Sequence, residues 1–334
     1  MERLVQGTAI RKYMPSTSVG ARLTRLAGNL LAARHARQGR LCILNYHRIL
    51  PAADPLLSTE PDVATFRWQM KALADYFNVL PLSEAIERDP SRPLPPRAVC
   101  ITFDDGYRST HDLALPILRE FGFAATVFVT TGYVNEGSMW NDRILTAVRE
   151  LRQDSLDLEN IGLGKIAVGT LDERRRAVEV VTETAKYLPP EQRESVIDRL
   201  AEMSGQCDPD QMLTESMLRS MVAQGIEIGA HTVSHPILTR LADPKAMFEI
   251  AESKRQLEAI IGEPVRYFAY PNGKRGIDFN ERHMAMAREA GFSAAFTTAP
   301  GAVAANHDRF ALPRARPWDR TPDRFVLRLL RWLA

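Results

Sequence analysis

The chain has 334 residues, of which 45% are hydrophobic and 25% are charged, and its formal net charge is +2. These values exclude a small disulfide-rich protein and predict a soluble globular protein of one large domain or two modest ones. The nearly balanced charge does not indicate nucleic acid, and we expect no such partner. The cysteines, Cys42, Cys100 and Cys207, show neither metal-ligand spacing nor a disulfide framework.

Residues 1–40 form a basic N-terminal segment with a helical apolar pattern. No apolar run there is long enough for a signal peptide or a membrane span, so we expect the protein in the cytoplasm. Residues 321–334 predict a second basic amphipathic helix. Such helices either pack on their own protein or lie on an anionic membrane surface, and peripheral contact with the inner membrane stays open.

Residues 41–320 alternate short apolar runs with helical patterns. The expected strands are 41–46, 78–80, 99–103, 124–129, 226–230 and 266–270, and the expected helices are 66–77, a short one from 83, 111–121, 214–224 and 244–261. This alternation indicates a parallel sheet or barrel, whose active-site residues collect at the C-terminal ends of the strands. Residues 139–212 break the pattern with many charges, helical stretches and no convincing strand, and predict a helical insertion that covers the site or recognises substrate.

Two adjacent carboxylates end the apolar run 99–103. Asp104 and Asp105 are followed by Gly106, and neighbouring carboxylates repel each other. The simplest way to keep both ionised is a cation beside them, so the pair indicates a metal site. The alternative interpretation of this motif alone is a helix N-cap.

Two histidines follow the apolar run 226–230. If the chain after His231 forms a helical turn, the spacing to His235 places both imidazoles on one side, about 6 Å apart. One carboxylate and two imidazoles leave open positions for water and substrate, which is typical of a catalytic metal site. The alternative for this motif alone is a solvated turn.

The stretch Thr102 to Gly106, followed by His231 to His235, resembles the first two motifs of the polysaccharide deacetylases, the NodB-homology or carbohydrate esterase family 4 group. The resemblance covers about residues 40–135 and 212–318. It implies a distorted (β/α)7 barrel and hydrolysis of an N-acetyl group on a sugar. It also implies Asp104 as the general base and a divalent metal, Zn²⁺ in the first instance, on Asp105, His231 and His235. The residues 41–49 and 310–314 resemble the branch found with bacterial exopolysaccharide synthesis.

The third family motif departs from its usual form. The resemblance implies an arginine, which orients the catalytic aspartate, where this chain has Ala269, and a tyrosine where it has Asn272. We predict that Arg314 replaces the arginine, because a planar guanidinium holds a carboxylate in two-point contact. The backbone N–H of Asn272 is expected to face the metal and the developing oxyanion.

The histidine that the family uses as general acid is also missing from its usual place. We predict His47 in this role, because it ends the first strand and an ordinary histidine pKa of about 6.5 allows proton donation near neutral pH. The alternative for His47 is a supporting contact. Tyr107 and Trp140 are expected on the substrate side, Trp140 by stacking on a sugar ring unless it lies in the core of the insertion.

The sequence thus predicts metal-dependent hydrolysis of the N-acetyl group of an N-acetylhexosamine-containing glycan in bacterial exopolysaccharide biosynthesis. One alternative is deacylation of a lipid-linked or nucleotide-linked sugar precursor, which the basic terminal helices favour. A second is a metal-containing glycan-binding protein without turnover, against which the intact Asp104 argues. A third is a glycosidase, but Asp104 and Asp105 are too close for that carboxylate pair and the histidines would have no role.

Overall fold

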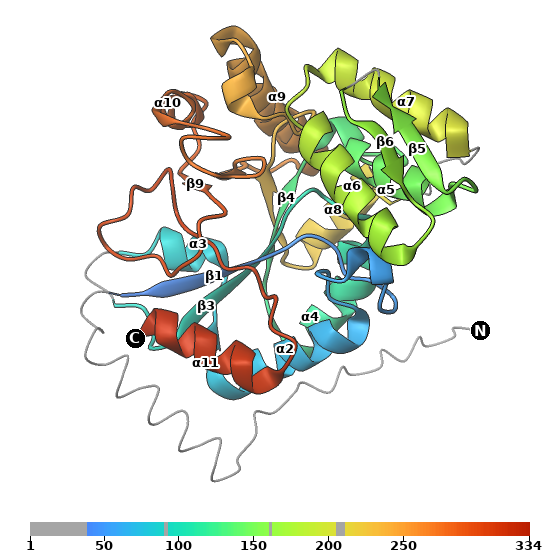
Figure 1. The fold of residues 1–334 in the computed structure, drawn as a ribbon. Helices are drawn as coiled ribbons and strands as arrows, with labels where there is room; N and C mark the ends of the chain where they lie inside the picture. The colour runs from blue at the N-terminus through green and yellow to red at the C-terminus, as the bar shows by residue number, and fades with distance from the viewer. Residues whose placement is uncertain (1–38, 90–92, 160–161, 205–210) are drawn as a thin grey trace, which may run out of the picture.

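A curled sheet forms the body of the protein. The structure is a computed structural model that describes residues 39–89, 93–159, 162–204 and 211–334 (Figure 1). The strands, all parallel, are in the order β1 (Leu41–Tyr46), β3 (Ala98–Phe103), β4 (Thr126–Val129), β7 (Glu227–Ala230), β8 (Tyr267–Ala269) and β9 (Ala294–Phe296), and β2 (Asn78–Val79) also pairs with β3. The sheet curls into a half-barrel with helices around it, so the predicted distorted barrel is confirmed. The predicted N-terminal helical segment lies outside the described residues, apart from residues 39 and 40.

An irregular segment, residues 303–315, occupies the gap between β9 and β1, and we call it the closing segment. The Leu312 N–H donates to the carbonyl of Ala295 in β9 at 3.0 Å, and the Ala315 N–H donates to the carbonyl of Ile43 in β1 at 2.7 Å. Backbone pairing on both sides satisfies the polar groups of the two edge strands. The barrel is therefore closed by a loop instead of a further strand.

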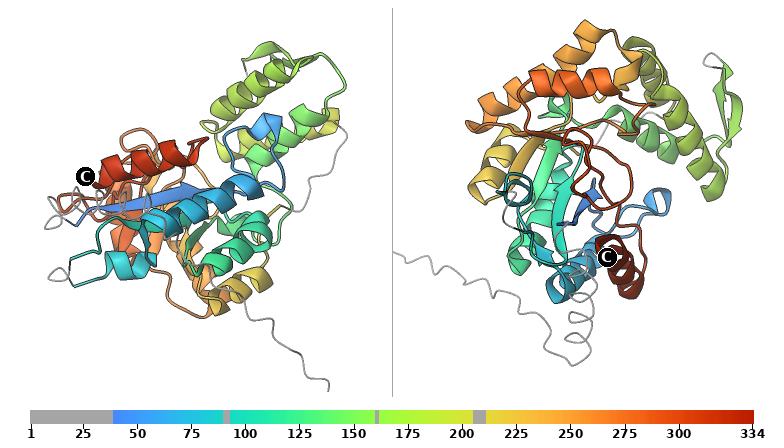
Figure 2. Two further views of the ribbon diagram at one scale, coloured as in Figure 1. Left: turned by 90° about the horizontal axis from the view of Figure 1, so that it is seen from below. Right: turned by 90° about the vertical axis from the view of Figure 1, so that its left-hand side faces the viewer.

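Helices cover the outer face of the sheet (Figure 2). They are α2 (Val63–Tyr76), α3 (Leu82–Ile86), α4 (Leu115–Phe121), α8 (Glu215–Ala223), α9 (Asp243–Ile261), α10 (Glu281–Glu289) and α11 (Pro322–Leu333). Side chains alternate along each strand, so Cys42 and Leu44 pack outward against helices while Leu41 and Ile43 fill the barrel interior. The same alternation points polar residues at the strand ends toward the mouth of the barrel.

The C-terminal helix α11 packs on the barrel. Its buried face includes Phe325 and Leu329, and the Phe325 ring lies 5.8 Å from the ring of Trp68 in α2. This face is the apolar one on which a membrane contact would depend. Within the described ranges, no helix has the length and apolar character needed to cross a membrane.

The expected helix 111–121 is divided. A π-helical turn, Thr110–Ala114, precedes α4, and Pro116 lies at the start of α4. Proline has no N–H to donate to the preceding turn, which explains why the α-helical hydrogen bonds begin only there.

The insertion, residues 139–212, forms a lobe beside the barrel mouth (Figure 1). It contains α5 (Trp140–Glu150), α6 (Leu171–Ala185) and α7 (Pro190–Ser204), and these helices enclose a core of their own. The expectation that it has no strand is wrong, because β5 (Ser155–Leu158) and β6 (Gly164–Ala167) form an antiparallel pair. Only Leu156 and Leu158 of β5 are buried, and two apolar residues in alternation are too few to mark a strand.

Candidate active site

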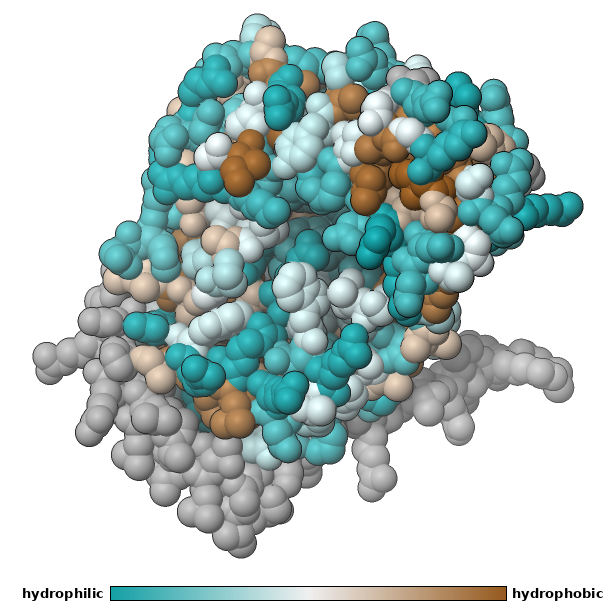
Figure 3. Space-filling view, viewed as in Figure 1, coloured by the Kyte–Doolittle hydropathy of each residue, from teal (hydrophilic) through white to brown (hydrophobic). Residues whose placement is uncertain are grey.

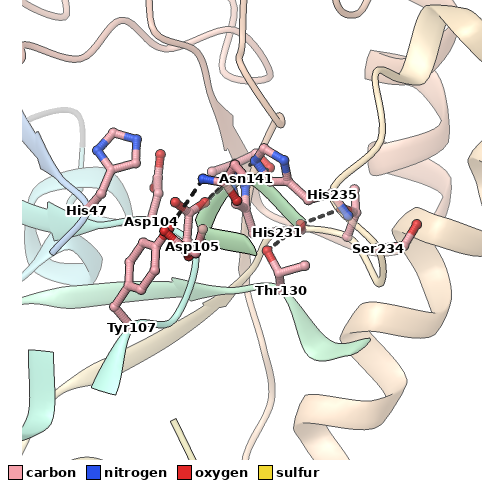
Figure 4. Close-up of polar contacts among 12 residues, drawn as sticks. His47, Asp104, Asp105, Tyr107, Thr130, Asn141, His231, Ser234 and His235 are labelled. Atoms are coloured by element: carbon pink, nitrogen blue, oxygen red, sulfur yellow. Dashed lines mark hydrogen bonds and ion pairs between the residues drawn. The ribbon is translucent and has the colours of Figure 1, made fainter. Parts of the chain in front are cut away.

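The end of β3 turns sharply and separates two neighbouring carboxylates. Asp105 and Gly106 both have positive φ, 75° and 88°. Glycine adopts this left-handed region freely and aspartate tolerates it better than most residues. A Cβ atom on Gly106 would lie 3.0 Å from Cγ1 of Val129, so space as well as conformation requires glycine here. As a result, Asp104 and Asp105 face different partners (Figure 4).

Asp104 faces Arg314. Its Oδ1 accepts a hydrogen bond from Nη1 at 2.6 Å and its Oδ2 accepts one from Nη2 at 2.7 Å, which is a two-point contact. Both side chains are buried. Burial would raise the pKa of Asp104, but the charge and hydrogen bonds of Arg314, together with the nearby histidines, outweigh burial and hold this pKa below its ordinary value. Asp104 is therefore an ionised carboxylate in a fixed orientation.

Arg314 is fixed by its own contacts. Its Nε–H donates to the carbonyl oxygen of Thr297 at 3.0 Å, and its Nη1 also donates to the Thr102 hydroxyl at 3.3 Å. Its backbone belongs to the closing segment. The guanidinium thus reaches Asp104 from the closing segment, whereas position 269 in β8 is occupied by a buried alanine.

Asp105, His231 and His235 bring three potential ligand atoms within 4.8 Å of one another (Figure 4). The Nε2 atoms of both histidines lie 3.5 Å from Oδ1 of Asp105. Ligand atoms bound at about 2.1 Å to a tetrahedral ion are roughly 3.4 Å apart, so this spacing fits one ion. The His231 Nδ1–H donates to the Ala269 carbonyl at 2.7 Å, which leaves its Nε2 lone pair for the ion. The residues present therefore fit a divalent cation.

The loop between the two histidines is a bend, and the helical turn expected from their spacing is wrong. Thr232 and His235 have positive φ, 68° and 54°. A β-branched residue is strained in this region, and such strain persists only where the surroundings enforce it. The Thr232 hydroxyl accepts a hydrogen bond from the His235 N–H at 3.1 Å, which closes the bend and brings the ring centroids of His231 and His235 within 4.9 Å.

Glu249 of α9 holds this bend, and sequence reasoning missed it. One of its carboxylate oxygens accepts hydrogen bonds from the backbone N–H groups of Val233 at 2.9 Å and Ser234 at 2.8 Å, and the other accepts from the Ser234 hydroxyl at 2.7 Å. Glu249 is 2% exposed. The signal was an acidic residue on the apolar face of α9, beside Ala246 and Ile250, since buried acids need a dedicated partner.

The electrostatics of the cluster suit a cation. Burial lowers the pKa of His235 to about 3, so its imidazole is neutral and can act as a ligand. For His231, burial lowers the pKa but the charges of Asp104 and Asp105 outweigh it and raise the pKa. The two carboxylates therefore favour a positive charge at this point, which a bound cation would supply.

His47 lies beside Asp104 at the end of β1 (Figure 4). Its Nε2 is 3.2 Å from Nη2 of Arg316, and because a guanidinium can only donate, Nε2 is the acceptor. Burial, followed by the charge of Arg316, lowers the pKa of His47 below its ordinary value. The neutral ring therefore carries its proton on Nδ1.

Tyr107 lies under Arg48, and little of its side chain is exposed to a substrate. The guanidinium carbon of Arg48 is 3.9 Å from the centre of the Tyr107 ring, and the hydroxyl accepts a hydrogen bond from Nδ2 of Asn141 at 3.4 Å. Arg48 also forms a buried ion pair with Asp142 of the insertion. Tyr107 thus takes part in the contact between barrel and insertion.

Trp140 lies in the core of the insertion, which is the alternative that the sequence left open. It is 3% exposed, and the guanidinium of Arg193 lies 4.8 Å from its ring centre. No open ring face is left for stacking on a sugar, so this expected role is not supported.

Asn272 occupies a tight turn after β8. It has a φ of 58°, and its carbonyl accepts a hydrogen bond from the Thr298 hydroxyl. Among the described residues, its backbone N–H has no hydrogen-bond acceptor. This N–H therefore remains available to an added group.

A curled parallel sheet that carries carboxylates and histidines at its strand ends defines a barrel hydrolase. The model of the family described as polysaccharide deacetylase matches residues 91–295, more than half of the chain, and the chain belongs to this family. It is accordingly a hydrolase, a carbohydrate N-deacetylase. The chain is 23% identical over 282 residues to YxkH of Bacillus subtilis (strain 168), whose name proposes a polysaccharide deacetylase, and this match covers 84% of the chain and 72% of YxkH.

Solved structures share the fold. The Streptococcus pyogenes deacetylase PplD, determined in complex with acetate, is 19% identical with a TM-score of 0.57, over 89% of this chain and 99% of PplD. IcaB from Ammonifex degensii is 21% identical with a TM-score of 0.56, over 89% of this chain and 98% of IcaB. The BpsB deacetylase domain from Bordetella bronchiseptica is 17% identical with a TM-score of 0.52, over 83% of this chain and 96% of that domain.

Proposed function

We propose that this chain removes N-acetyl groups from the N-acetylhexosamine units of a bacterial exopolysaccharide, with a divalent cation held by Asp105, His231 and His235. The observation that carries the proposal is the position of Asp104, an ionised carboxylate fixed by Arg314, directly beside a three-residue ligand cluster. Two imidazoles and one carboxylate are a donor set suited to Zn²⁺. The resemblance of residues 41–49 and 310–314 to the exopolysaccharide branch supports a polymer as substrate, and the match to the polysaccharide deacetylase family agrees with it.

Each residue has one task in the reaction. When bound, the cation would supply Lewis-acid chemistry to the acetyl carbonyl and make a water molecule more acidic. Asp104 accepts the proton of the attacking water, because each of its oxygens has a lone pair besides the one that faces Arg314. The free N–H of Asn272 donates to the oxygen on which negative charge develops. His47, in its imidazolium form, protonates the leaving amine, and acetate and the free amino sugar are the products.

The alternatives have less support. The alternative of a lipid-linked precursor rests on membrane contact by the two terminal helices. The apolar face of α11, however, is buried against the barrel. The alternative of a binding protein without turnover rests on the arginine that is missing at position 269. However, Arg314 contacts Asp104 instead.

Acetate release from N-acetylglucosamine oligomers and from a polyprenyl-linked N-acetyl sugar, before and after chelation and Zn²⁺ addition, tests the function. We expect release that chelation abolishes and Zn²⁺ restores, with the oligomers preferred. Asp104→Asn should abolish release and keep about one metal ion per chain, whereas His231→Ala should lose both. Asp172→Asn, on the exposed surface of the insertion, is the matched control and should keep full activity. Retained turnover in Asp104→Asn would contradict the mechanism.

A further inference from the structure

A cavity of about 240 Å³ lies on the side of His47, because one of its lining residues, Pro317, directly follows Arg316, the partner of His47. It is lined by residues 53–65, which lead from the loop after β1 into the first turn of α2, and by residues 317–320, which lead from the closing segment to α11. The two stretches are far apart in sequence, and both approach the mouth of the barrel in Figure 1. Figure 3 shows the face seen in Figure 1, which has a hollow near its middle with mostly hydrophilic side chains around it.

Trp318 is the large aromatic side chain of this cavity, and it is 60% exposed. The residues on both sides of it are anchored. The Pro317 carbonyl accepts a hydrogen bond from Nε2 of Gln69 at 3.0 Å, and the Asp319 carboxylate accepts one from Nε of Arg328 at 2.8 Å. An indole ring exposed to this extent between two anchored neighbours presents a face on which a sugar ring can stack.

Glu60 supplies an uncommitted carboxylate to the same cavity. Other carboxylates that line it are engaged: Asp54 pairs with Arg149 at 2.6 Å, and Asp62 accepts from the Thr65 N–H at 2.8 Å. Within the described part of the chain, the Glu60 side chain makes no hydrogen bond or ion pair. An ionised carboxylate accepts hydrogen bonds at both oxygens, which suits the hydroxyl groups of a sugar.

A short stretch of chain connects the cavity to the catalytic carboxylate. Arg314 holds Asp104, Arg316 contacts His47 at 3.2 Å, and the guanidinium carbon of Arg316 lies 5.4 Å from the ring centre of Trp318. Four residue steps span at most roughly 14 Å, even when fully extended. The Trp318 ring is therefore within reach of a short oligosaccharide whose other end lies at Asp104.

We propose that this cavity is a glycan subsite, in which Trp318 stacks on the ring of a sugar that neighbours the one being deacetylated and Glu60 accepts hydrogen bonds from the hydroxyls of that sugar. The proposal rests on the proposed function and adds to it the two residues of this chain that bind the neighbouring sugar. The C–H face of a pyranose ring is apolar and carries partial positive charge, so it complements the negative face of an indole.

Binding and turnover, measured separately, test the subsite. Calorimetric titration of the Zn²⁺-loaded protein with an N-acetylglucosamine oligomer should give an affinity that falls roughly 3- to 10-fold in Trp318→Ala and also falls in Glu60→Gln. The ratio of kcat/KM on the oligomer to kcat/KM on N-acetylglucosamine should fall by a similar factor, mainly through KM. Phe248→Ala removes a comparably exposed aromatic residue from α9, and it should leave both measurements unchanged.

The two proposals fail in different ways. Unchanged oligomer affinity and an unchanged length preference in Trp318→Ala would overturn the subsite, whether or not the protein releases acetate. Absence of chelator-sensitive acetate release from every substrate would overturn the proposed function, while a loss of oligomer affinity in Trp318→Ala but not in Phe248→Ala would still support the subsite. Circular dichroism of each variant ensures that any loss reflects the side chain and not the fold.

Discussion

Arg314 binds both carboxylate oxygens of Asp104, which lies 210 residues earlier in the chain. The contact joins the closing segment to the end of β3, at a carboxylate that lies beside the ligand cluster but is not part of it. A buried two-point ion pair fixes orientation as well as charge.

Arg314→Lys should lower kcat by about 10- to 100-fold while the metal content stays unchanged, because an ammonium group retains the charge but cannot bind both oxygens at once. Acetate release and elemental analysis of the purified variant measure these two quantities. The control is Arg266→Lys, in an exposed ion pair with Glu87, which should behave like the parent protein. An unchanged kcat in Arg314→Lys would show that the two-point contact has no part in turnover.

Glu249→Gln should weaken Zn²⁺ binding by about 10- to 100-fold, since the bend that carries His231 and His235 loses a charged acceptor of two backbone N–H groups. Competition with a chromophoric chelator measures the affinity without any reference to activity. Glu252→Gln, one turn further along the same helix and paired with Arg255 at the surface, should bind the metal normally. Equal affinities in the two variants would contradict the role given to Glu249.

Asp142→Asn should destabilise the protein by about 3–5 kcal/mol, because it leaves the charge of Arg48 buried without its ionised partner. The double variant Arg48→Met with Asp142→Leu should recover much of this loss, since it removes both charges from the interface between barrel and insertion. Denaturant unfolding gives the free energies. Arg175→Met, in an exposed ion pair with Asp172, should cost less than about 1 kcal/mol. A smaller loss in Asp142→Asn than in Arg175→Met would be incompatible with a buried pair.

Arg316→Gln should raise the pKa of His47 toward its ordinary value, because it removes the cation beside the ring while burial remains. Histidine NMR titration, with His47→Gln to assign the resonance, measures this change. If the His47 imidazolium protonates the leaving amine, the rate falls as pH rises through this pKa, and Arg316→Gln moves the fall to higher pH. A pH–rate profile that does not move with the NMR pKa would exclude His47 as the proton donor.

The same lowered pKa affects stability. Below a pH of about 6.5 the unfolded chain protonates its histidine at position 47 before the folded protein does. The contribution of neutral His47 to stability is therefore complete above that pH and is lost as pH falls through the lower pKa of the folded state. Arg316→Gln should reduce this loss.

The sequence predicted the strands that carry the chemistry because they are continuous apolar runs that end in unusual polar groups. Asp104 and Asp105 after β3, and His231 after β7, are visible in this way. The strand β9 was missed, because Ala294, Ala295 and Phe296 form a run too short and too poor in β-branched residues to stand out. Its place in the sheet depends on pairing with β8, which is a tertiary contact.

Within the candidate site, the sequence identified residues by type and spacing but not by conformation. The meeting of Arg314 with Asp104 could be predicted because a buried carboxylate needs a partner and Ala269 cannot be one. The bend between the histidines could not be predicted, since its positive φ values depend on Glu249 from a helix elsewhere in the chain. Trp140 was ambiguous for a similar reason: whether an aromatic residue faces substrate or core is decided by packing.

Because the closing segment lies near the end of the chain, the order of synthesis affects when the site is complete. Strands β1 to β9 can leave the ribosome and begin to pair, but Asp104 has no cation beside it until Arg314 has been made and docked between β9 and β1. A nascent chain that lacks residues 303–315 therefore has an open sheet edge and an Asp104 carboxylate without its two-point partner. With Asp104 as the proposed base, the barrel is completed and activity begins in the same late step of synthesis.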